Sequence, residues 1–154
     1  METHHGLDQL TALTTEQRNA ASRDIDRLST EEIVRLIAAE DSKVVEAVAK
    51  AVPTIVQAAD LIASALKRGG RLIYVGSGTS GRLGVLDAAE LLPTYGVGDD
   101  KMKAIIAGGP GAVFTPIEGA EDDYEAGARD VETVGVDERD VVVGISASGR
   151  TPYV

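Results

Sequence analysis

The sequence predicts an α/β protein: a three-layer, doubly wound parallel sheet that is truncated on its C-terminal side and preceded by helices. Three apolar segments lead to this prediction, residues 71–75, 103–107 and 140–145, and each has the composition of a buried strand. Helical patterns separate the segments, as expected when crossover helices join parallel strands. The first and third segments each run into a loop of glycines and hydroxyl side chains, which makes these strand ends the expected ligand site.

The length and composition are those of one globular domain. The 154 residues are 44% hydrophobic and 26% charged, which allows a core. The net charge of −10 opposes non-specific binding to nucleic acid or anionic membranes, so we expect neither as a partner. The sequence has no cysteine, which excludes a disulfide framework and a thiolate metal site. Because no apolar run approaches about 18 residues and no signal peptide is present, we expect a cytoplasmic protein.

Weak helical patterns follow a polar N-terminal tail. Residues 1–14 lack periodicity, and we interpret His4 and His5 as part of a frayed end rather than as metal ligands. Residues 15–28 form a weakly amphipathic segment that needs a partner surface to be stable. The capping box Ser29-Thr-Glu-Glu32 then predicts the start of a helix.

A longer helix is expected from about Ser42 to Lys67, with Pro53 kinking or restarting it and Gly69 ending it. This helix leads directly into the first strand. We therefore divide the chain into an N-terminal tail and helical segment, residues 1–41, and the first part of an α/β domain, residues 42–154, that is incomplete at its C-terminus.

Two further helices are expected between the strands. The first runs from about Gly81 to Leu92 and is stopped by Pro93. The second begins near the acidic segment Glu118-Gly-Ala-Glu-Asp-Asp123, whose carboxylates suit a helix N-terminus, and it runs to about Val134, where Gly135 closes it.

The sequence stops where another helix is expected to begin. The third strand enters the loop Ser146-Ala-Ser-Gly-Arg-Thr-Pro152, and Pro152 is placed for the first turn of a helix. Three strands make half of a doubly wound sheet, so we expect the N-terminal part of a longer protein. A small three-stranded domain with a disordered tail remains the alternative.

The first loop, Gly76-Ser-Gly-Thr-Ser-Gly81, is predicted to bind a phosphate. Its glycines allow a tight turn and a close approach of the backbone to a ligand. The loop amides and the positive end of the following helix dipole face the same point, which favours an anion. Ser77, Thr79 and Ser80 add hydroxyl donors.

The glycine spacing of this loop, Gly76-x-Gly78-x-x-Gly81, also matches the dinucleotide-binding fingerprint. A nicotinamide site needs an acidic residue at the carboxyl end of the next strand. Residues 103–107 instead end in Gly108-Gly-Pro110, which has no carboxylate. Three hydroxyls also suit a terminal phosphate better than a pyrophosphate, so we favour a phosphate group over a dinucleotide.

Two hydroxyl-rich loops after two parallel strands resemble those of the sugar isomerase (SIS) domain, which implies that a phosphosugar binds. Further motifs closely resemble the family of N-acetylmuramic acid 6-phosphate etherases. These motifs are Leu86-Asp-Ala-Ala-Glu90, Pro93-Thr-Tyr-Gly96, Ile117-Glu-Gly-Ala-Glu-Asp122 and the run from Asp140 to Val154. The family is roughly twice this length, so its C-terminal half is absent here. Ala89, Leu91 and Leu92 depart from the family pattern, but the acid among them is kept.

The resemblance implies a lyase of cell-wall amino-sugar recycling that removes the D-lactyl ether from N-acetylmuramic acid 6-phosphate by elimination and then adds water. It implies Glu90 as the acid that protonates the departing lactate and Glu121 as the base that takes the C2 proton. Two carboxyl groups suffice for this reaction, so we expect no metal and no organic cofactor. The family also implies a homodimer. Candidate ligands for the sugar phosphate are Ser77, Gly78, Thr79, Ser80, Ser146, Ser148 and Thr151.

The residues give partial support of their own for these roles. Glu90 shares a helix stripe with Leu83 and Leu86 and is expected in the last helical turn, and both positions would favour its protonated form. A solvated glutamate at a helix end is the alternative. Glu121 stands in an acidic cluster that a helix N-terminus favours for dipole reasons alone. The loop hydroxyls are alternatively helix caps.

Two other functions remain open at this point. A regulatory SIS protein would bind a phosphosugar through both loops and would need neither carboxylate. A phosphosugar aldose–ketose isomerase would share the proton removal at C2 but would leave the C3 substituent in place. Release of D-lactate separates all three functions. Arg82 and Arg150 can pair either with the phosphate or with the acidic surface.

Overall fold

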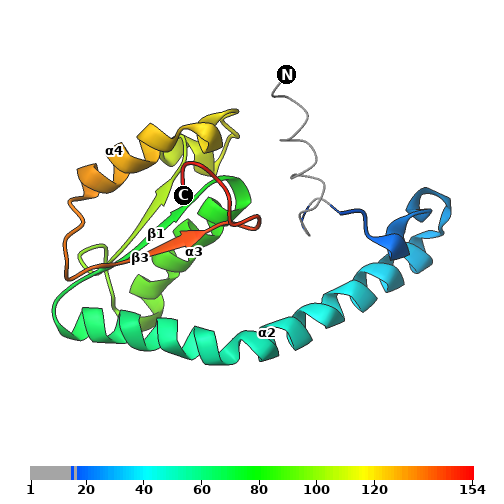
Figure 1. Cartoon of the computed structure of the whole chain (residues 1–154), viewed down its shortest axis with the longest axis horizontal. Helices are drawn as coiled ribbons and strands as arrows, with labels where there is room; N and C mark the ends of the chain where they lie inside the picture. The colour runs from blue at the N-terminus through cyan, green and yellow to red at the C-terminus, as the bar shows by residue number, and fades with distance from the viewer. Residues whose placement is uncertain (1–14, 16) are drawn as a thin grey trace, which may run out of the picture. The chain divides into compact units, whose positions relative to one another are not determined.

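The computed structural model describes residue 15 and residues 17–154 (Figure 1). The predictions for residues 1–14, including the one for His4 and His5, lie outside this described part.

The chain forms two compact units, the first ending at Val56 and the second spanning Gln57–Val154. The domain boundary between residues 41 and 42 that the sequence predicts stays a proposal.

Within residues 17–28, the weakly amphipathic segment of the first unit has two short 3-10 helices, η2 (Ala20–Ser22) and η3 (Ile25–Arg27). Asn19 caps the first of them, because its Oδ1 accepts a hydrogen bond of 2.9 Å from the N–H of Ala21. The few apolar side chains of this segment do not offset the cost of nucleating a longer α-helix.

Helix α2 spans Thr30–Lys67 as one element (Figure 1). The predicted capping box starts it: the N–H of Ser29 donates to Glu32 Oε2 at 2.8 Å, and the N–H of Glu32 donates to Ser29 Oγ at 3.4 Å. The prediction of a separate helix from about Ser42 is wrong, because the first helix continues through this position. Pro53 does not restart the helix either, since it removes only one hydrogen bond from an alanine-rich stretch with high helix propensity. Gly69, with a φ of 86°, follows the helix end as predicted.

The middle of α2 is apolar around most of its circumference. Its polar side chains recur every three or four residues from Lys43 to Lys67, and the side chains between them are mostly valine, isoleucine, leucine and alanine. By length and composition α2 also qualifies as a candidate membrane span, with a mean hydropathy of 1.2. This is weak evidence, since core helices of soluble proteins have the same properties. The exposed large apolar side chains of this stretch are Val44, Val45, Val48, Val52, Ile55, Val56 and Leu61.

The second unit contains the predicted parallel sheet, with its three strands in the order β2-β1-β3. The strands are β1 (Leu72–Gly76), β2 (Met102–Ile106) and β3 (Val141–Ile145). Gly76 at the end of β1 lies opposite Ile106 on one side and Ile145 on the other. The carboxyl ends of all three strands therefore meet at one edge of the sheet, and the loops after β1 and β3 lie at this edge.

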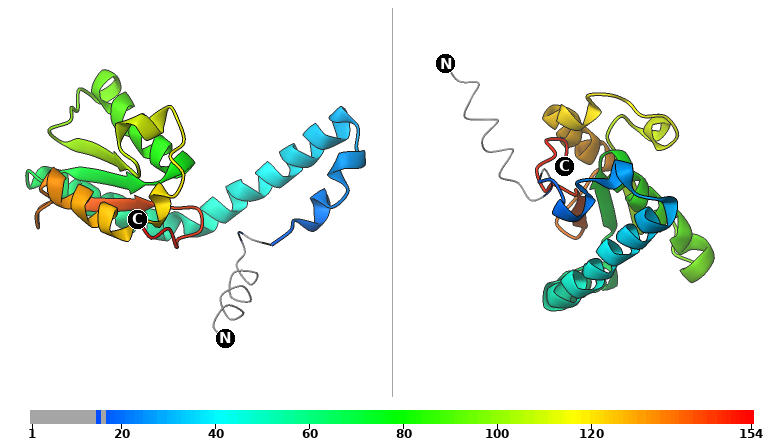
Figure 2. Two further views of the ribbon diagram at one scale, coloured as in Figure 1. Left: turned by 90° about the horizontal axis from the view of Figure 1, so that it is seen from above. Right: turned by 90° about the vertical axis from the view of Figure 1, so that its right-hand side faces the viewer.

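Helices α3 (Gly78–Tyr95) and α4 (Tyr124–Val134) cover opposite faces of the sheet (Figure 2). Tyr74 points toward α3, because a Cβ added to Gly84 of that helix would lie 3.0 Å from the Cβ of Tyr74. Its neighbours Ile73 and Val75 point the other way and pack with side chains of α4. This alternation along one strand confirms the predicted three-layer, doubly wound architecture.

The two outer strands of the described sheet are less buried than β1. Val142 of β3 is 44% exposed, whereas Ile73 and Val75 of β1 are almost fully buried. Residues 140–145 have the composition of a strand that is covered on both faces, but in the described chain one face of β3 is partly exposed. Strand β3 therefore has apolar side chains that the described chain leaves partly exposed.

Helix α3 is longer than predicted at both ends. It begins at Gly78 rather than Gly81, and Pro93 does not stop it. The missing N–H of Pro93 leaves the carbonyl of Ala89 without its helical partner, and Ala89 is exposed, so that water can hydrate it. The helix ends at Gly96, where φ is 68° and the N–H donates to the carbonyl of Leu92 at 2.9 Å.

Candidate functional site

The predicted phosphate loop connects β1 to α3 through a tight contact between two glycines. A Cβ added to Gly81 would lie 2.9 Å from the carbonyl carbon of Gly76 and 2.7 Å from Ile106 Cγ1. Only glycine fits here, so the first turn of α3 rests directly on the end of β1. The N-terminal amides and the positive end of the helix dipole are thereby held at the carboxyl edge of the sheet, a geometry that suits an anion.

Ser77 is the N-cap residue of α3 by backbone position, but its side chain makes no capping hydrogen bond. The Ser77 hydroxyl instead lies 3.5 Å from Glu121 Oε2 and is placed to donate to it. The hydroxyl of Ser77 is therefore not used as a helix cap, which was the alternative for this side chain. Thr79, which is exposed, and Ser80, which is half-buried, follow in the first turn of α3.

A small pocket of about 80 Å³ lies beside this loop. One wall comes from the loop and from α3, and the other wall comes from the segment between β2 and α4. That segment contains two short turns, η4 (Pro110–Val113) and η5 (Ala120–Asp122). The pocket thus brings the phosphate loop together with carboxylates that lie about 40 residues further along the chain. The lining residues are Ser77, Gly78, Arg82, Ala107, Ala112, Pro116, Ile117, Glu118 and Glu121.

The acidic cluster at residues 118–123 divides between two tasks. Asp123 caps α4, because its Oδ1 accepts a hydrogen bond of 2.8 Å from the N–H of Ala126. Glu121 lies one turn earlier, in η5, and lines the pocket with Glu118. The dipole of α4 therefore accounts for Asp123 and does not account for the position of Glu121.

The second loop is organised by its own hydroxyls. Ser146 Oγ lies 2.8 Å from Thr151 Oγ1 and 3.3 Å from Ser148 Oγ, and it accepts a hydrogen bond of 3.1 Å from the N–H of Gly149. The N–H of Arg150 donates to Ser148 Oγ at 3.2 Å. These hydroxyls shape a turn at the end of β3, next to the end of β1.

Tyr153 joins this second loop to the carboxylate segment, a role that no sequence pattern predicts. Its N–H donates to the carbonyl of Glu121 at 3.0 Å. Its ring is 3% exposed, and its hydroxyl donates to Asp130 of α4. Burial, together with this hydrogen bond, raises the pKa of Tyr153 well above its ordinary range. The signal in the sequence is only a large aromatic residue after the loop.

Glu90 lies away from the pocket in the described chain. It follows Gly78 by twelve residues on α3, which corresponds to about 18 Å along the helix axis. The stripe it shares with Leu83 and Leu86 is exposed, at 56% and 57% for the two leucines. The helix continues to Tyr95, so Glu90 is not in the last turn. The expectation that an apolar stripe covers Glu90 and the expectation that Glu90 lies in the last helical turn are therefore both wrong.

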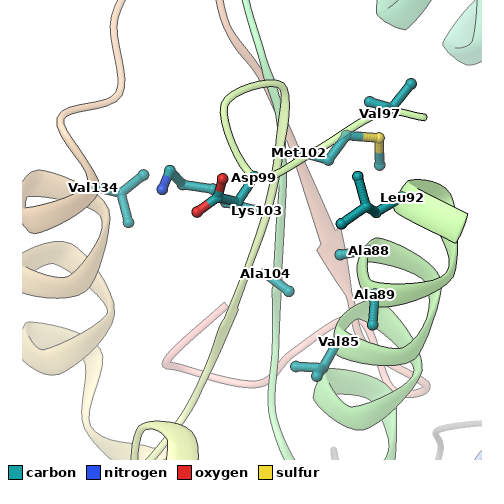
Figure 3. A pocket seen from close by; sticks show the side chains of 11 residues that line it. Val85, Ala88, Ala89, Leu92, Val97, Asp99, Met102, Lys103, Ala104 and Val134 are labelled. Atoms are coloured by element: carbon teal, nitrogen blue, oxygen red, sulfur yellow. The ribbon is translucent and has the colours of Figure 1, made fainter.

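A larger cavity in the second unit, about 500 Å³, lies between α3 and β2 (Figure 3). Apolar side chains such as Val85, Leu92 and Met102 line it, with Asp99 and Lys103 also on its wall. The predicted catalytic and ligand residues do not line this cavity. The small pocket at the phosphate loop is therefore the candidate site, because the predicted site residues Ser77, Gly78 and Glu121 line it.

The chain has a parallel sheet with a hydroxyl-rich loop at a helix N-terminus, the arrangement that the sequence motifs indicate for a SIS domain, and the sequence comparison agrees. The family model for the glucokinase regulatory protein N-terminal SIS domain matches residues 54–154, about two thirds of the chain. The chain belongs to this SIS-domain family.

The relatives at high identity are named N-acetylmuramic acid 6-phosphate etherase. The chain is 55% identical to the protein of this name from Lactobacillus acidophilus over 142 residues, 92% of this chain and 48% of the relative. It is 55% identical to that of Glaesserella parasuis over 148 residues, 96% of this chain and 49% of the relative. The resemblance to this family that the sequence motifs indicate is confirmed. The chain spans about half the length of the curated relatives it matches.

Proposed function

We propose that the protein acts in the cleavage of the D-lactyl ether of N-acetylmuramic acid 6-phosphate, which gives N-acetylglucosamine 6-phosphate and D-lactate. The observation that supports this most is the pocket in which Ser77 of the phosphate loop faces Glu121, in a chain 55% identical to relatives with the etherase name. The proposed process is cell-wall amino-sugar recycling in the cytoplasm, and the proposed substrate class is a sugar 6-phosphate.

In the proposed reaction the phosphate binds at the amides of the first turn of α3, with hydroxyls of both loops around the sugar. The Glu121 carboxylate takes the proton from C2 of the open-chain sugar, next to the aldehyde. The C3–O bond then breaks, and Glu90 as an acid delivers a proton to the lactate oxygen. Water adds across the resulting C2=C3 bond, with its oxygen at C3 and a proton at C2. These reaction steps involve no net oxidation or reduction, and the two carboxyl groups carry all the proton transfers.

The position of Glu90 adds a requirement to this proposal. About 18 Å of helix separates Glu90 from the loop of its own chain, which is too far for both to act on one sugar. The proposed active form is a homodimer, in which Glu90 of a second copy approaches the loop. The exposed leucines beside Glu90 support a contact on that face of α3.

The test measures D-lactate released from N-acetylmuramic acid 6-phosphate. It compares the 154-residue chain with a hybrid in which the C-terminal half of the Lactobacillus acidophilus relative follows Val154. We expect the hybrid to release D-lactate and to form N-acetylglucosamine 6-phosphate in equal amounts. A hybrid that binds the sugar phosphate without releasing lactate would favour a regulatory module, and a ketose product would favour an isomerase.

A further inference from the structure

We propose that Arg82 is a positioning residue that sets the distance between the phosphate loop and the carboxylate segment containing Glu121. This inference rests on the proposed function, since it assigns a role around the same pocket. Arg82 lies on the second turn of α3 and lines the pocket together with Ser77 and Gly78 of the loop wall. Its side chain crosses from that wall to the opposite one.

The guanidinium of Arg82 binds two consecutive backbone carbonyls on the opposite wall. Its Nε donates to the carbonyl of Val113 at 2.9 Å, and its Nη2 donates to the carbonyl of Ala112 at 2.8 Å. These are the last carbonyls of η4, and the end of a helical turn leaves such groups without a partner in the turn. The two N–H groups form a planar fork, a geometry that lysine cannot reproduce.

The turn held by Arg82 is packed against the segment that leads to Glu121. Ala112 is 4% exposed. A Cβ added to Gly108 would lie 3.0 Å from Ile117 Cδ1 and 3.4 Å from Ala112 Cβ, so that these side chains meet over the glycine. The carbonyl of Ile117 accepts a hydrogen bond of 3.4 Å from the N–H of Ala120, the first residue of η5. A shift of η4 therefore displaces Ile117 and, through it, Glu121.

The same contacts argue against Arg82 as a direct ligand of the phosphate. The fork that would bind two phosphate oxygens is already occupied by the two carbonyls. Among the described residues that line the pocket, Arg82 is the one cation, and Glu118 and Glu121 supply two carboxylates. A firm attachment of this cation to the backbone keeps it from pairing freely with either carboxylate.

The experiment uses the form that releases D-lactate, either the chain or the hybrid, and compares Arg82→Ala and Arg82→Lys with the parent. We expect kcat for lactate release to fall on the order of 100-fold in Arg82→Ala, as for a misplaced catalytic group. The KM for the sugar phosphate should change by less than about threefold. Arg82→Lys should not restore kcat, whereas added guanidinium ion should partly restore Arg82→Ala. Arg139→Ala, at an exposed arginine that pairs with Asp137, is the matched control and should behave as the parent.

Proton exchange at C2, followed by NMR in deuterated water, gives the decisive readout. If Arg82 acts through Glu121, exchange should fall together with lactate release in both variants. Should KM rise and inhibition by inorganic phosphate weaken while kcat is kept, Arg82 is a phosphate ligand and the inference is overturned. A folded Arg82→Lys variant with parental exchange would overturn it too, even if Arg82→Ala fails to fold. Absence of lactate release from the parent hybrid would count against the proposed function instead.

Discussion

At the scale of single residues, one buried ion pair joins the beginnings of β1 and β3. Arg71 Nη2 lies 2.6 Å from Asp140 Oδ2, and the side chain of Asp140 is 2% exposed. Asp140 also accepts hydrogen bonds from the backbone N–H groups of Arg71 and Asp137, at 2.8 and 3.1 Å. The hydrogen bonds from Arg71 hold the pKa of the Asp140 carboxyl well below its usual range. Neither side chain was singled out from the sequence.

This ion pair predicts a stability that depends on pH. Because the pKa of Asp140 is lower in the folded state, its contribution is complete above the ordinary carboxyl pKa of about 4 and is lost as the pH falls further. We expect Asp140→Asn to lower the free energy of unfolding by about 3 kcal/mol at pH 7. Urea unfolding between pH 7 and pH 3 measures both effects. The variant should lose less stability on acidification than the parent, and parallel losses would contradict the assignment.

The two proposed catalytic carboxylates predict separable defects. In the lactate-releasing form, Glu90→Gln should abolish lactate release and leave C2 proton exchange largely intact, because the leaving-group acid is not needed for proton removal. Glu121→Gln should abolish both. NMR in deuterated water and a D-lactate assay measure the two steps. Loss of exchange in Glu90→Gln, with the sugar phosphate still bound, would remove the role given to Glu90.

At the scale of elements, the start of α3 decides which anion fits the carboxyl edge of the sheet. The loop spacing Gly76-x-Gly78-x-x-Gly81 is compatible with a dinucleotide, and the contact between Gly76 and Gly81 is as close as that motif requires. The difference lies in the hydroxyl of Ser77, which faces a carboxylate across a pocket of about 80 Å³.

Calorimetry checks this preference directly. We expect N-acetylglucosamine 6-phosphate to bind the hybrid in preference to NAD. Ser77→Ala should weaken sugar phosphate binding by about tenfold, the loss of one hydrogen bond to a charged group. Ser42→Ala on α2, where the hydroxyl donates to the carbonyl of Ala39, is the matched control and should bind normally. Preferential binding of NAD would contradict the phosphosugar assignment.

At the scale of the whole molecule, the described chain leaves much apolar surface in water. Val48 and Ile55 of α2 are each 49% exposed, and Val142 of β3 is 44% exposed. A helix that is polar along only one narrow stripe is usually covered by other helices or by a second subunit. These surfaces support the proposed homodimer and predict that the chain self-associates.

Sedimentation of two variants tests this prediction. Val48→Lys places a charge in the apolar part of α2, and we expect it to lower the average mass in solution. Lys50→Glu changes a charge on the polar stripe of the same helix and should leave the mass unchanged. A parent chain that stays strictly monomeric at high concentration would contradict the proposed role of this surface.

The exposed strand β3 predicts weak catalysis by the 154-residue chain alone. Its outer edge has unpaired backbone groups in the described sheet, and one of its faces is partly bare. An error near 1 Å in the position of the catalytic groups can cost on the order of 100-fold in rate. We therefore expect D-lactate release at least about 100-fold slower than that of the hybrid. Equal turnover from a monomeric chain would show that the described part is sufficient.

Local patterns in the sequence were enough to predict the three strands, their parallel orientation and the glycine-rich turn between β1 and α3. Burial leaves continuous apolar runs in strands, and a tight turn at a helix N-terminus demands glycine, so both features can be recognised without tertiary contacts. The capping box at Ser29 and the helix ends at Gly69 and Gly135 were predicted for the same reason.

Tertiary structure alone decided which side chains meet. Five acidic residues lie between positions 118 and 125, and only the fold separates Asp123, which caps α4, from Glu121, which faces Ser77. The attachment of Arg82 to the carbonyls of η4 and the exposure of Glu90 likewise depend on contacts between segments far apart in the chain. Helical pattern and dipole arguments describe one element at a time, whereas a site is made where several elements converge, and their relative positions follow from the packing of the whole sheet and its helices.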